Sequence, residues 1–163
     1  MRSAIVWDWN GTLLDDVDVC VKAINRLLVA RRLAPMTRER YHQIFTFPVQ
    51  RYYEAMGFDF AHEYHDSYAA VVADAPLRPD AVPALERAAA CGVPQLVLSA
   101  LEERRLLREL ETHGIRGYFA AVYGLGDLHA VSKAARGAEL VAEWGGPVVD
   151  TLLAALHEAA VCS

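Results

Sequence analysis

Residues 5–15 read IVWDWNGTLLD, an apolar run that leads directly into an aspartate, a glycine and a threonine. Such a run predicts a buried parallel strand, and Gly11 allows the backbone to turn sharply after it. Asp8 then lies at the carboxyl end of the strand, where open α/β sheets bind their ligands. Thr12 adds a hydroxyl and an amide that can face an anion. A carboxylate in this place can be a covalent nucleophile or can merely cap the next helix, and the whole string favours the nucleophile.

The composition is that of an ordinary globular domain with a sizeable core: 163 residues, 54% hydrophobic and 23% charged. The formal net charge of −5 argues against nucleic acid and anionic membranes as partners. No apolar run is long enough to span a membrane, and no basic leader segment precedes the first strand. The 3 cysteines are widely spaced and form no Cys-x-x-Cys pair. We therefore expect reduced thiols and a cytoplasmic location.

After the first strand, apolar runs alternate with helical stripes, which predicts a doubly wound, Rossmann-like α/β fold with a shortened parallel sheet. The further strands are expected at 95–99, 119–123 and 147–150. The helices that precede them are expected at 81–90, 102–113 and 132–144.

Between the first strand and residue 81, the spacing of apolar residues and of Pro and Gly predicts helices alone. These helices are expected at 16–33, 37–45, 48–56 and 60–73. An insertion of this length is too long for a simple crossover, so we expect residues 15–80 to form a helical cap. Residues 1–14 and 81–163 would then form the α/β core domain.

Two further polar residues occur at the boundaries of predicted elements. Ser99 ends the second strand just before a helix, where its hydroxyl and the helix amides form an anion site or a simple cap. Lys133 begins the helix after the third strand, where it is either a solvated cation or a neutralising charge. Lys22 is the only other lysine in the chain, which makes the position of Lys133 informative.

The first stretch resembles the first motif of the haloacid dehalogenase-like hydrolases, Asp-x-Asp-Gly-Thr, at Asp8, Asn10, Gly11 and Thr12. The resemblance implies that Asp8 is the nucleophile and that Asn10 gives its backbone carbonyl to Mg²⁺. It also implies that Gly11 and Thr12 contact the phosphate. In phosphatases of this family, the second aspartate protonates the leaving group and later activates water. Asn10 takes its place, and an amide can do neither.

The resemblance extends in chain order over residues 3–144. Ser99 matches the family's second motif, so Ser99 and Ala100 would hold the phosphoryl oxygens. Lys133 matches the third motif, whose ammonium group neutralises the nucleophile and the phosphoryl charge. A helical insertion between the first two motifs is the cap that closes on substrate in this family.

The family's fourth motif, Gly-Asp-x-x-x-Asp, has no full match in this sequence. Asp150 and Asp127 each supply its first aspartate, but neither has an acidic residue four positions later. Asp127 is our candidate to complete a Mg²⁺ site with Asp8 and Asn10. A third interpretation is that the chain lacks a strand–helix unit of roughly 40 to 50 residues, and that residues 146–152 follow the absent motif.

These residues predict a Mg²⁺-dependent phosphatase-type hydrolase that acts on a small phosphorylated metabolite through an aspartyl-phosphate on Asp8. Arg51 and Tyr52 in the cap are candidate substrate contacts. With Asn10 in the first motif, acyl phosphates and anhydrides suit the site better than sugar phosphates, because their leaving groups need no proton.

Two other hypotheses stay open. The chain can be a catalytically inactive relative that binds a small ligand or a partner subunit, including a second copy along an exposed edge of the sheet. It can also be an unrelated doubly wound domain with a chance Asp-Gly-Thr turn.

Overall fold

The computed structural model describes residues 3–44, 61–126 and 133–150. The chain divides into two compact units. One unit, here the core unit, comprises Met1–Leu14 and Leu77–Ser163, and the other, here the inserted unit, comprises Asp15–Pro76. Within the described residues, no helix has both the length and the apolar character needed to cross a membrane.

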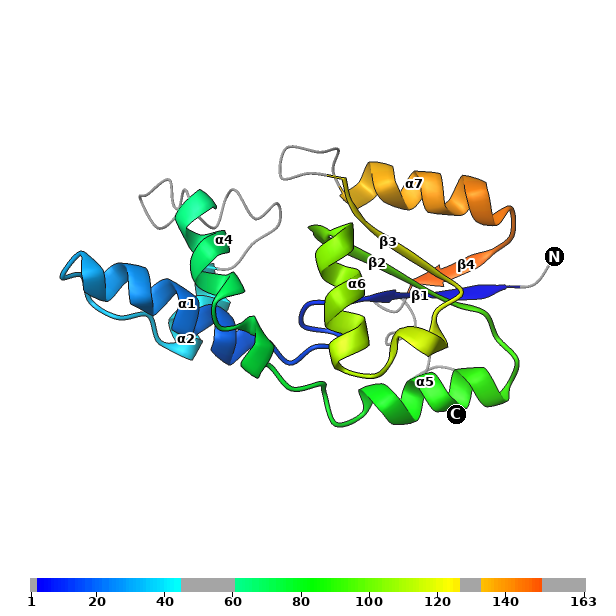
Figure 1. Cartoon of the computed structure of the whole chain (residues 1–163), viewed down its shortest axis with the longest axis horizontal. Coiled ribbons are helices and arrows are strands. Elements are labelled where there is room, and N and C mark those ends of the chain that lie inside the picture. Colours follow the sequence, from blue (N-terminus) through cyan, green and yellow to red (C-terminus); the bar gives the residue numbers. More distant parts are fainter. Residues whose placement is uncertain (1–2, 45–60, 127–132, 151–163) are drawn as a thin grey trace. The chain divides into compact units, whose positions relative to one another are not determined.

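The core unit is built on a parallel four-stranded sheet in the order β3-β2-β1-β4 (Figure 1). Its strands are β1 Ala4–Asp8, β2 Gln95–Glu102, β3 Ala121–Leu125 and β4 Val148–Asp150. Because β1 is central and all strands run parallel, the carboxyl end of β1 faces the same edge as the ends of its neighbours. The predicted α/β fold, with helices inserted after the first strand, is confirmed.

Side chains alternate between the two faces of the sheet, and each face is covered by helices. The helices of the core unit are α5 Ala81–Ala90, α6 Glu103–Thr112 and α7 Lys133–Trp144. Val6 and Leu96 form a buried cluster with Leu140 of α7. On the other face, the Gln95 amide donates to the Leu85 carbonyl of α5 at 3.0 Å. Figure 1 shows α7 on one side of the sheet and α5 on the other, which is the doubly wound arrangement.

Several boundaries in the core unit differ from the sequence prediction, and two of the differences have a clear physical reason. The second strand, expected at 95–99, continues to Glu102, whose carboxylate then caps α6 by accepting from the amides of Arg104 and Arg105. The third strand begins at Ala121 rather than at residue 119, because a 3-10 turn, η2 (Arg116–Tyr118), precedes it.

The inserted unit is helical in its described part. Its elements are α1 Val17–Ala30, α2 Arg38–Ile44, α4 Ala61–Ala69 and the 3-10 turn η1 Val72–Asp74. The helix expected at 60–73 therefore ends at Ala69, and the chain tightens into η1 while Val71 and Val72 remain buried. The helix expected at 48–56 lies outside the described residues.

A polar cluster is buried inside the inserted unit. The carboxylate of Asp16, itself buried, accepts from the Tyr68 hydroxyl at 2.8 Å and from the Cys20 thiol at 3.6 Å. Burial, and then the charge of Asp16, raises the pKa of Cys20 to about 12. This thiol therefore stays protonated and is a packing group rather than a nucleophile.

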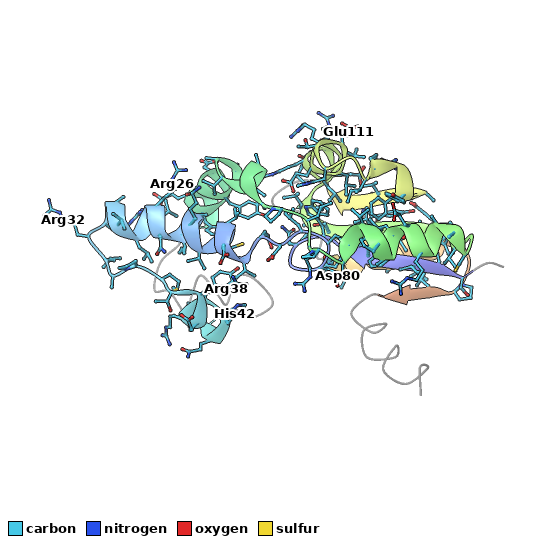
Figure 2. All side chains as sticks on the ribbon, turned by 90° about the horizontal axis from the view of Figure 1, so that it is seen from below. Arg26, Arg32, Arg38, His42, Asp80 and Glu111 are labelled. Atoms are coloured by element: carbon cyan, nitrogen blue, oxygen red, sulfur yellow. The ribbon has the colours of Figure 1, made fainter. Side chains whose placement is uncertain are left out.

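Charged side chains lie at the surface of both units, as Figure 2 shows for six labelled residues. The exposed side chains labelled there are Arg26, Arg32, Arg38, His42, Asp80 and Glu111.

Gly124 of β3 lies against the junction between β2 and α6, where there is no room for a side chain. A Cβ atom on Gly124 would lie 2.4 Å from the Glu103 Cα atom and 2.7 Å from the Leu101 carbonyl oxygen. Both contacts are with backbone, which cannot rotate away. Gly124 thus allows the close approach of β3 to the end of β2.

We predict that Gly124→Ala lowers the free energy of unfolding by about 1–3 kcal/mol, the usual cost of overpacking. The matched control is Gly117→Ala, because Gly117 is exposed and a Cβ atom there meets nothing within 4 Å. Urea unfolding measures both variants. Equal unfolding midpoints for the two variants would contradict this account of Gly124.

Candidate active site

The loop that follows β1 is held in a tight turn by its own backbone. The Trp9 carbonyl accepts from three successive amides, those of Thr12, Leu13 and Leu14. Gly11 makes the turn possible with a φ of +74°, in the left-handed region that favours glycine. The amide of Thr12, which we expected to face an anion, is therefore directed into the turn at 3.3 Å.

Asp8 and Lys133, far apart in the sequence, form an ion pair at the carboxyl end of β1. The distance from Lys133 Nζ to Asp8 Oδ1 is 2.6 Å, and the same oxygen accepts from the Trp9 amide at 2.8 Å. The side chains are 19% exposed for Asp8 and 34% for Lys133. A partly buried carboxylate beside a fixed ammonium group, reachable from solvent, is suited to attack an anionic phosphate.

Packing of α7 places Lys133 at this edge. Gly137 in α7 lies close to Leu98 of β2, where an added Cβ atom would be 3.2 Å from the leucine side chain. Leu140, one turn later, is buried in the cluster beneath α7. The first residue of α7 thereby reaches the end of β1.

The side chain of Ser99, in β2, is in contact with that of Asn10, in the loop after the neighbouring strand β1. The buried Ser99 hydroxyl, 1% exposed, donates to the Asn10 side-chain oxygen at 3.4 Å and accepts from the Leu101 amide at 3.1 Å. Ala100 follows on β2 and is exposed. The structure thus brings Asp8, Asn10 and Ser99 to one edge of the sheet, and their roles stay predictions.

A Mg²⁺ site at this edge has only part of its expected ligands among the described residues. Asp127, Arg51 and Tyr52 lie outside the described part of the chain. Within that part, no group of three His, Cys, Asp or Glu side chains gathers where a metal could bind. The oxygens of Asp8 and of the Asn10 backbone still suit Mg²⁺, which is often held by one or two carboxylates, water and substrate phosphate.

β4 lies beside β1 at one edge of the sheet. Its last residue, Asp150, pairs with Val6, two residues before Asp8. A strand therefore borders this side of β1, and the interpretation that a strand–helix unit is missing stays a prediction.

A polar chain beneath the loop was not anticipated from the sequence. Trp9 is fully buried, and its indole N–H donates to Glu109 Oε2 of α6 at 2.7 Å. The other oxygen of Glu109 accepts from Arg105 at 3.1 Å, and the ring of His113 lies 5.8 Å from that of Trp9. The spacing of Arg105, Glu109 and His113 at every fourth position is the signal that could have revealed a shared helix face.

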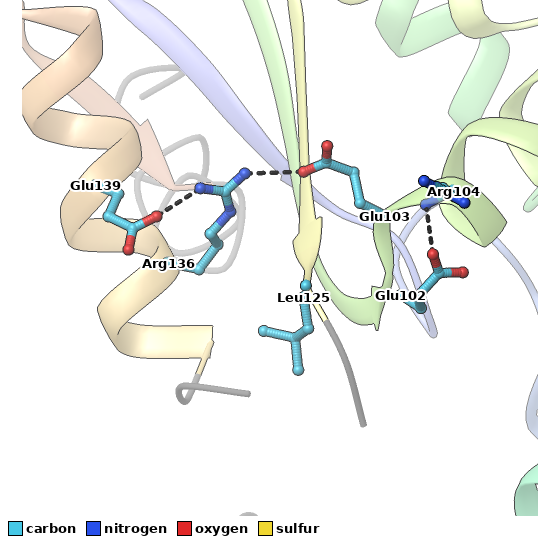
Figure 3. Close-up of a pocket in the computed structure, with 7 residues that line it drawn as sticks. Glu102, Glu103, Arg104, Leu125, Arg136 and Glu139 are labelled. Carbon is cyan, nitrogen blue, oxygen red and sulfur yellow. Dashed lines mark hydrogen bonds and ion pairs between the residues drawn. The ribbon is translucent and has the colours of Figure 1, made fainter. Parts of the chain in front are cut away.

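A charged pocket of about 400 Å³ lies at the ends of β2 and β3, lined among others by Glu103, Leu125 and Arg136 (Figure 3). Arg136 forms ion pairs with Glu103 and Glu139, donates to the Gly124 carbonyl and lies over the Tyr123 ring. The bonds to Glu139 and then to Glu103 raise the pKa of Arg136. The bond to Gly124 and the contact with Tyr123 connect α7 to β3, and the ion pair with Glu103 connects α7 to α6, one turn after Lys133.

The chain is similar to known proteins in family and in fold. Residues 5–134 match the family model described as haloacid dehalogenase-like hydrolase. A search of curated proteins finds no significant match.

Solved structures of low sequence identity share the fold. Protein tyrosine kinase A of Mycobacterium tuberculosis is 23% identical with a TM-score of 0.77, over 90% of this chain and 73% of that one. A predicted phosphatase of Clostridium acetobutylicum is 15% identical with a TM-score of 0.75, over 92% and 75%. A haloacid dehalogenase-like hydrolase of Streptococcus pneumoniae is 16% identical with a TM-score of 0.66, over 91% and 74%.

Burial lowers the pKa of His113, against a smaller opposing effect of Glu109. The unfolded chain then binds more protons than the folded chain between the lowered pKa and the ordinary value of 6.5. We predict that the free energy of unfolding falls as the pH decreases through this range. His113→Gln should flatten the slope, because it removes the titrating ring. Urea unfolding over a pH series measures the slope, and an unchanged slope in His113→Gln would contradict the prediction.

Proposed function

Because the chain belongs to the haloacid dehalogenase-like hydrolases, we propose that it transfers a phosphoryl group from a small phosphorylated metabolite to Asp8. The ion pair between Asp8 and Lys133 is the observation that carries this proposal. It brings the carboxylate proposed as the nucleophile beside a positive charge at the carboxyl end of β1, where α/β sheets bind ligands.

In the proposed reaction, a carboxylate oxygen of Asp8 attacks phosphorus, and the bond from phosphorus to the leaving oxygen breaks. Lys133 would offset the negative charge of the transferred group, and the Ser99 hydroxyl, which donates to Asn10 in this structure, would donate to one of its oxygens instead. Phosphatases of this family typically use Mg²⁺. Asp8 and the backbone carbonyl of Asn10 would hold it, and it would add positive charge at the phosphate.

Asn10 determines which substrates the site can use. Its amide oxygen accepts from Ser99, and its amide nitrogen carries no proton that can be transferred near neutral pH. The side chain therefore cannot protonate a departing alkoxide or take a proton from water. We infer that the substrates are acyl phosphates or phosphoric anhydrides, and that phosphate leaves Asp8 slowly.

The first experiment measures phosphate release from acetyl phosphate with Mg²⁺ by the wild-type chain and by Asp8→Asn. We expect release by the wild type and a loss of at least about 100-fold in the variant, because the nucleophile is removed. Calorimetric titration with Mg²⁺ alone should show binding that weakens in Asp8→Asn. Equal release by both proteins would overturn the mechanism. Binding without release would favour the alternative, a relative that retains the site only to hold a ligand.

Asn10→Asp should restore the missing proton transfer. We predict that it raises hydrolysis of an unactivated substrate, glycerol phosphate, by about 10²–10⁴-fold, the usual contribution of general acid–base catalysis. Asn10→Ala is the matched control, since it removes the amide without supplying a carboxylate. A gain of equal size in both variants would show that the amide acts only by obstructing the site.

A further inference from the structure

We propose that Glu109 of α6 is a positioning residue, which holds the nucleophile loop in its active geometry through the indole of Trp9. The proposal rests on the function proposed above for Asp8. Glu109 need not touch the substrate: it is bonded to Trp9, and Trp9 is bonded to Asp8.

The backbone of Trp9 controls both ends of the loop. Its amide donates to Asp8 Oδ1 at 2.8 Å, so it helps to orient the nucleophile. Its carbonyl accepts from the amides of residues 12–14 and so closes the turn. The next residue, Asn10, carries the backbone oxygen assigned to Mg²⁺. A shift of Trp9 would therefore move the nucleophile and a proposed metal ligand together.

The only polar group in the side chain of Trp9 is its indole N–H, and this group donates one hydrogen bond, to Glu109. The residue is 0% exposed, so the indole N–H cannot turn to water, and an unsatisfied buried donor is costly. Glu109 satisfies that donor at 2.7 Å. Because a hydrogen bond is directional, it fixes the orientation of the buried indole ring as well as its distance from α6.

Glu109 is itself held in place. Its side chain is 14% exposed, and Arg105, 19% exposed and one turn earlier on α6, binds its second oxygen at 3.1 Å. The guanidinium charge offsets the carboxylate, which permits a partly buried ion beneath the loop. Since α6 begins directly after β2, the same helix is tied to the strand that carries Ser99.

A second tryptophan provides an internal comparison. Trp7 donates its indole N–H to the Gln95 side chain at 2.9 Å, a bond of the same kind. However, Trp7 lies within β1 and is paired in register with Val97, so the sheet ladder already fixes its backbone. Trp9 follows the last paired residue of β1, so its backbone bonds lie within the loop itself, and the bond to Glu109 ties that loop to α6.

The test compares Glu109→Ala, Glu109→Gln and Trp7→Phe in the full chain. Because phosphate is inferred to leave Asp8 slowly, phosphorylation of Asp8 by acetyl phosphate with Mg²⁺ is followed in a single turnover. This one step gives a rate constant, kcat, and a half-saturating concentration, KM, and urea unfolding gives stability. We expect Glu109→Ala to lower kcat by about 10- to 100-fold with a small change in KM, as for other residues that orient a ligand. Glu109→Gln should recover most of the rate, because its amide oxygen still accepts from the indole. Trp7→Phe should lose stability and keep the wild-type kcat.

A second readout does not depend on turnover. Hydrogen exchange of the Trp9 indole and backbone N–H groups, followed by NMR, should be slow in the wild type and in Glu109→Gln. It should be faster in Glu109→Ala and unchanged in Trp7→Phe.

The outcomes separate the two proposals. If Glu109→Ala keeps the wild-type kcat, or loses only as much as Trp7→Phe at equal stability, the positioning role is wrong. If the wild type is never phosphorylated, the proposed function fails. The hydrogen exchange of Trp9 would then still test whether Glu109 holds the loop. If exchange in Glu109→Ala equals that in the wild type, the positioning role is wrong too.

Discussion

The salt bridge between Asp8 and Lys133 depends on the whole of the core unit. Asp8 is the last residue of β1, and Lys133 is the first residue of α7, the helix between β3 and β4. Each partner reaches its place only if the sheet has its observed order and α7 lies close over β2. Gly137 against Leu98, and Arg136 bound to β3, provide that close packing. The ion pair of the candidate site is therefore a direct consequence of how α7 packs on the sheet.

Much of this arrangement follows from local sequence patterns. Apolar runs give the strands, and the carboxyl ends of parallel strands must share one edge, so Asp8 and Ser99 could be placed near each other in advance. The ends of elements were harder, because the extension of β2 to Glu102 depends on the cap that Glu102 makes with its own side chain. The intrinsic preferences of the residues around Glu102 do not show whether the strand continues or the helix begins there.

The bond from Trp9 to Glu109 could not be predicted in the same way. The two residues are 100 positions apart, and nothing in either local pattern specifies the other. A tryptophan in an apolar run indicates a core residue, and a glutamate on an amphipathic helix indicates a solvated one. Only the packing of α6 on the loop after β1 makes them partners. Similarly, the fold shared with a tyrosine kinase and with phosphatases describes architecture alone, so function must be argued from residues such as Asn10.

The central position of β1 also bears on how the chain reaches its native state. The register pairs Ile5 with Gln95 and Ala4 with Val148, so about 90 and about 140 residues separate the first strand from its two neighbours. During synthesis, this apolar strand leaves the ribosome long before either partner exists. Its pairing must await closure of two very long loops, which makes assembly of the sheet slow and leaves β1 in need of protection from non-native contacts. A strand order that gathers Asp8, Asn10 and Ser99 at one edge thus makes folding slower.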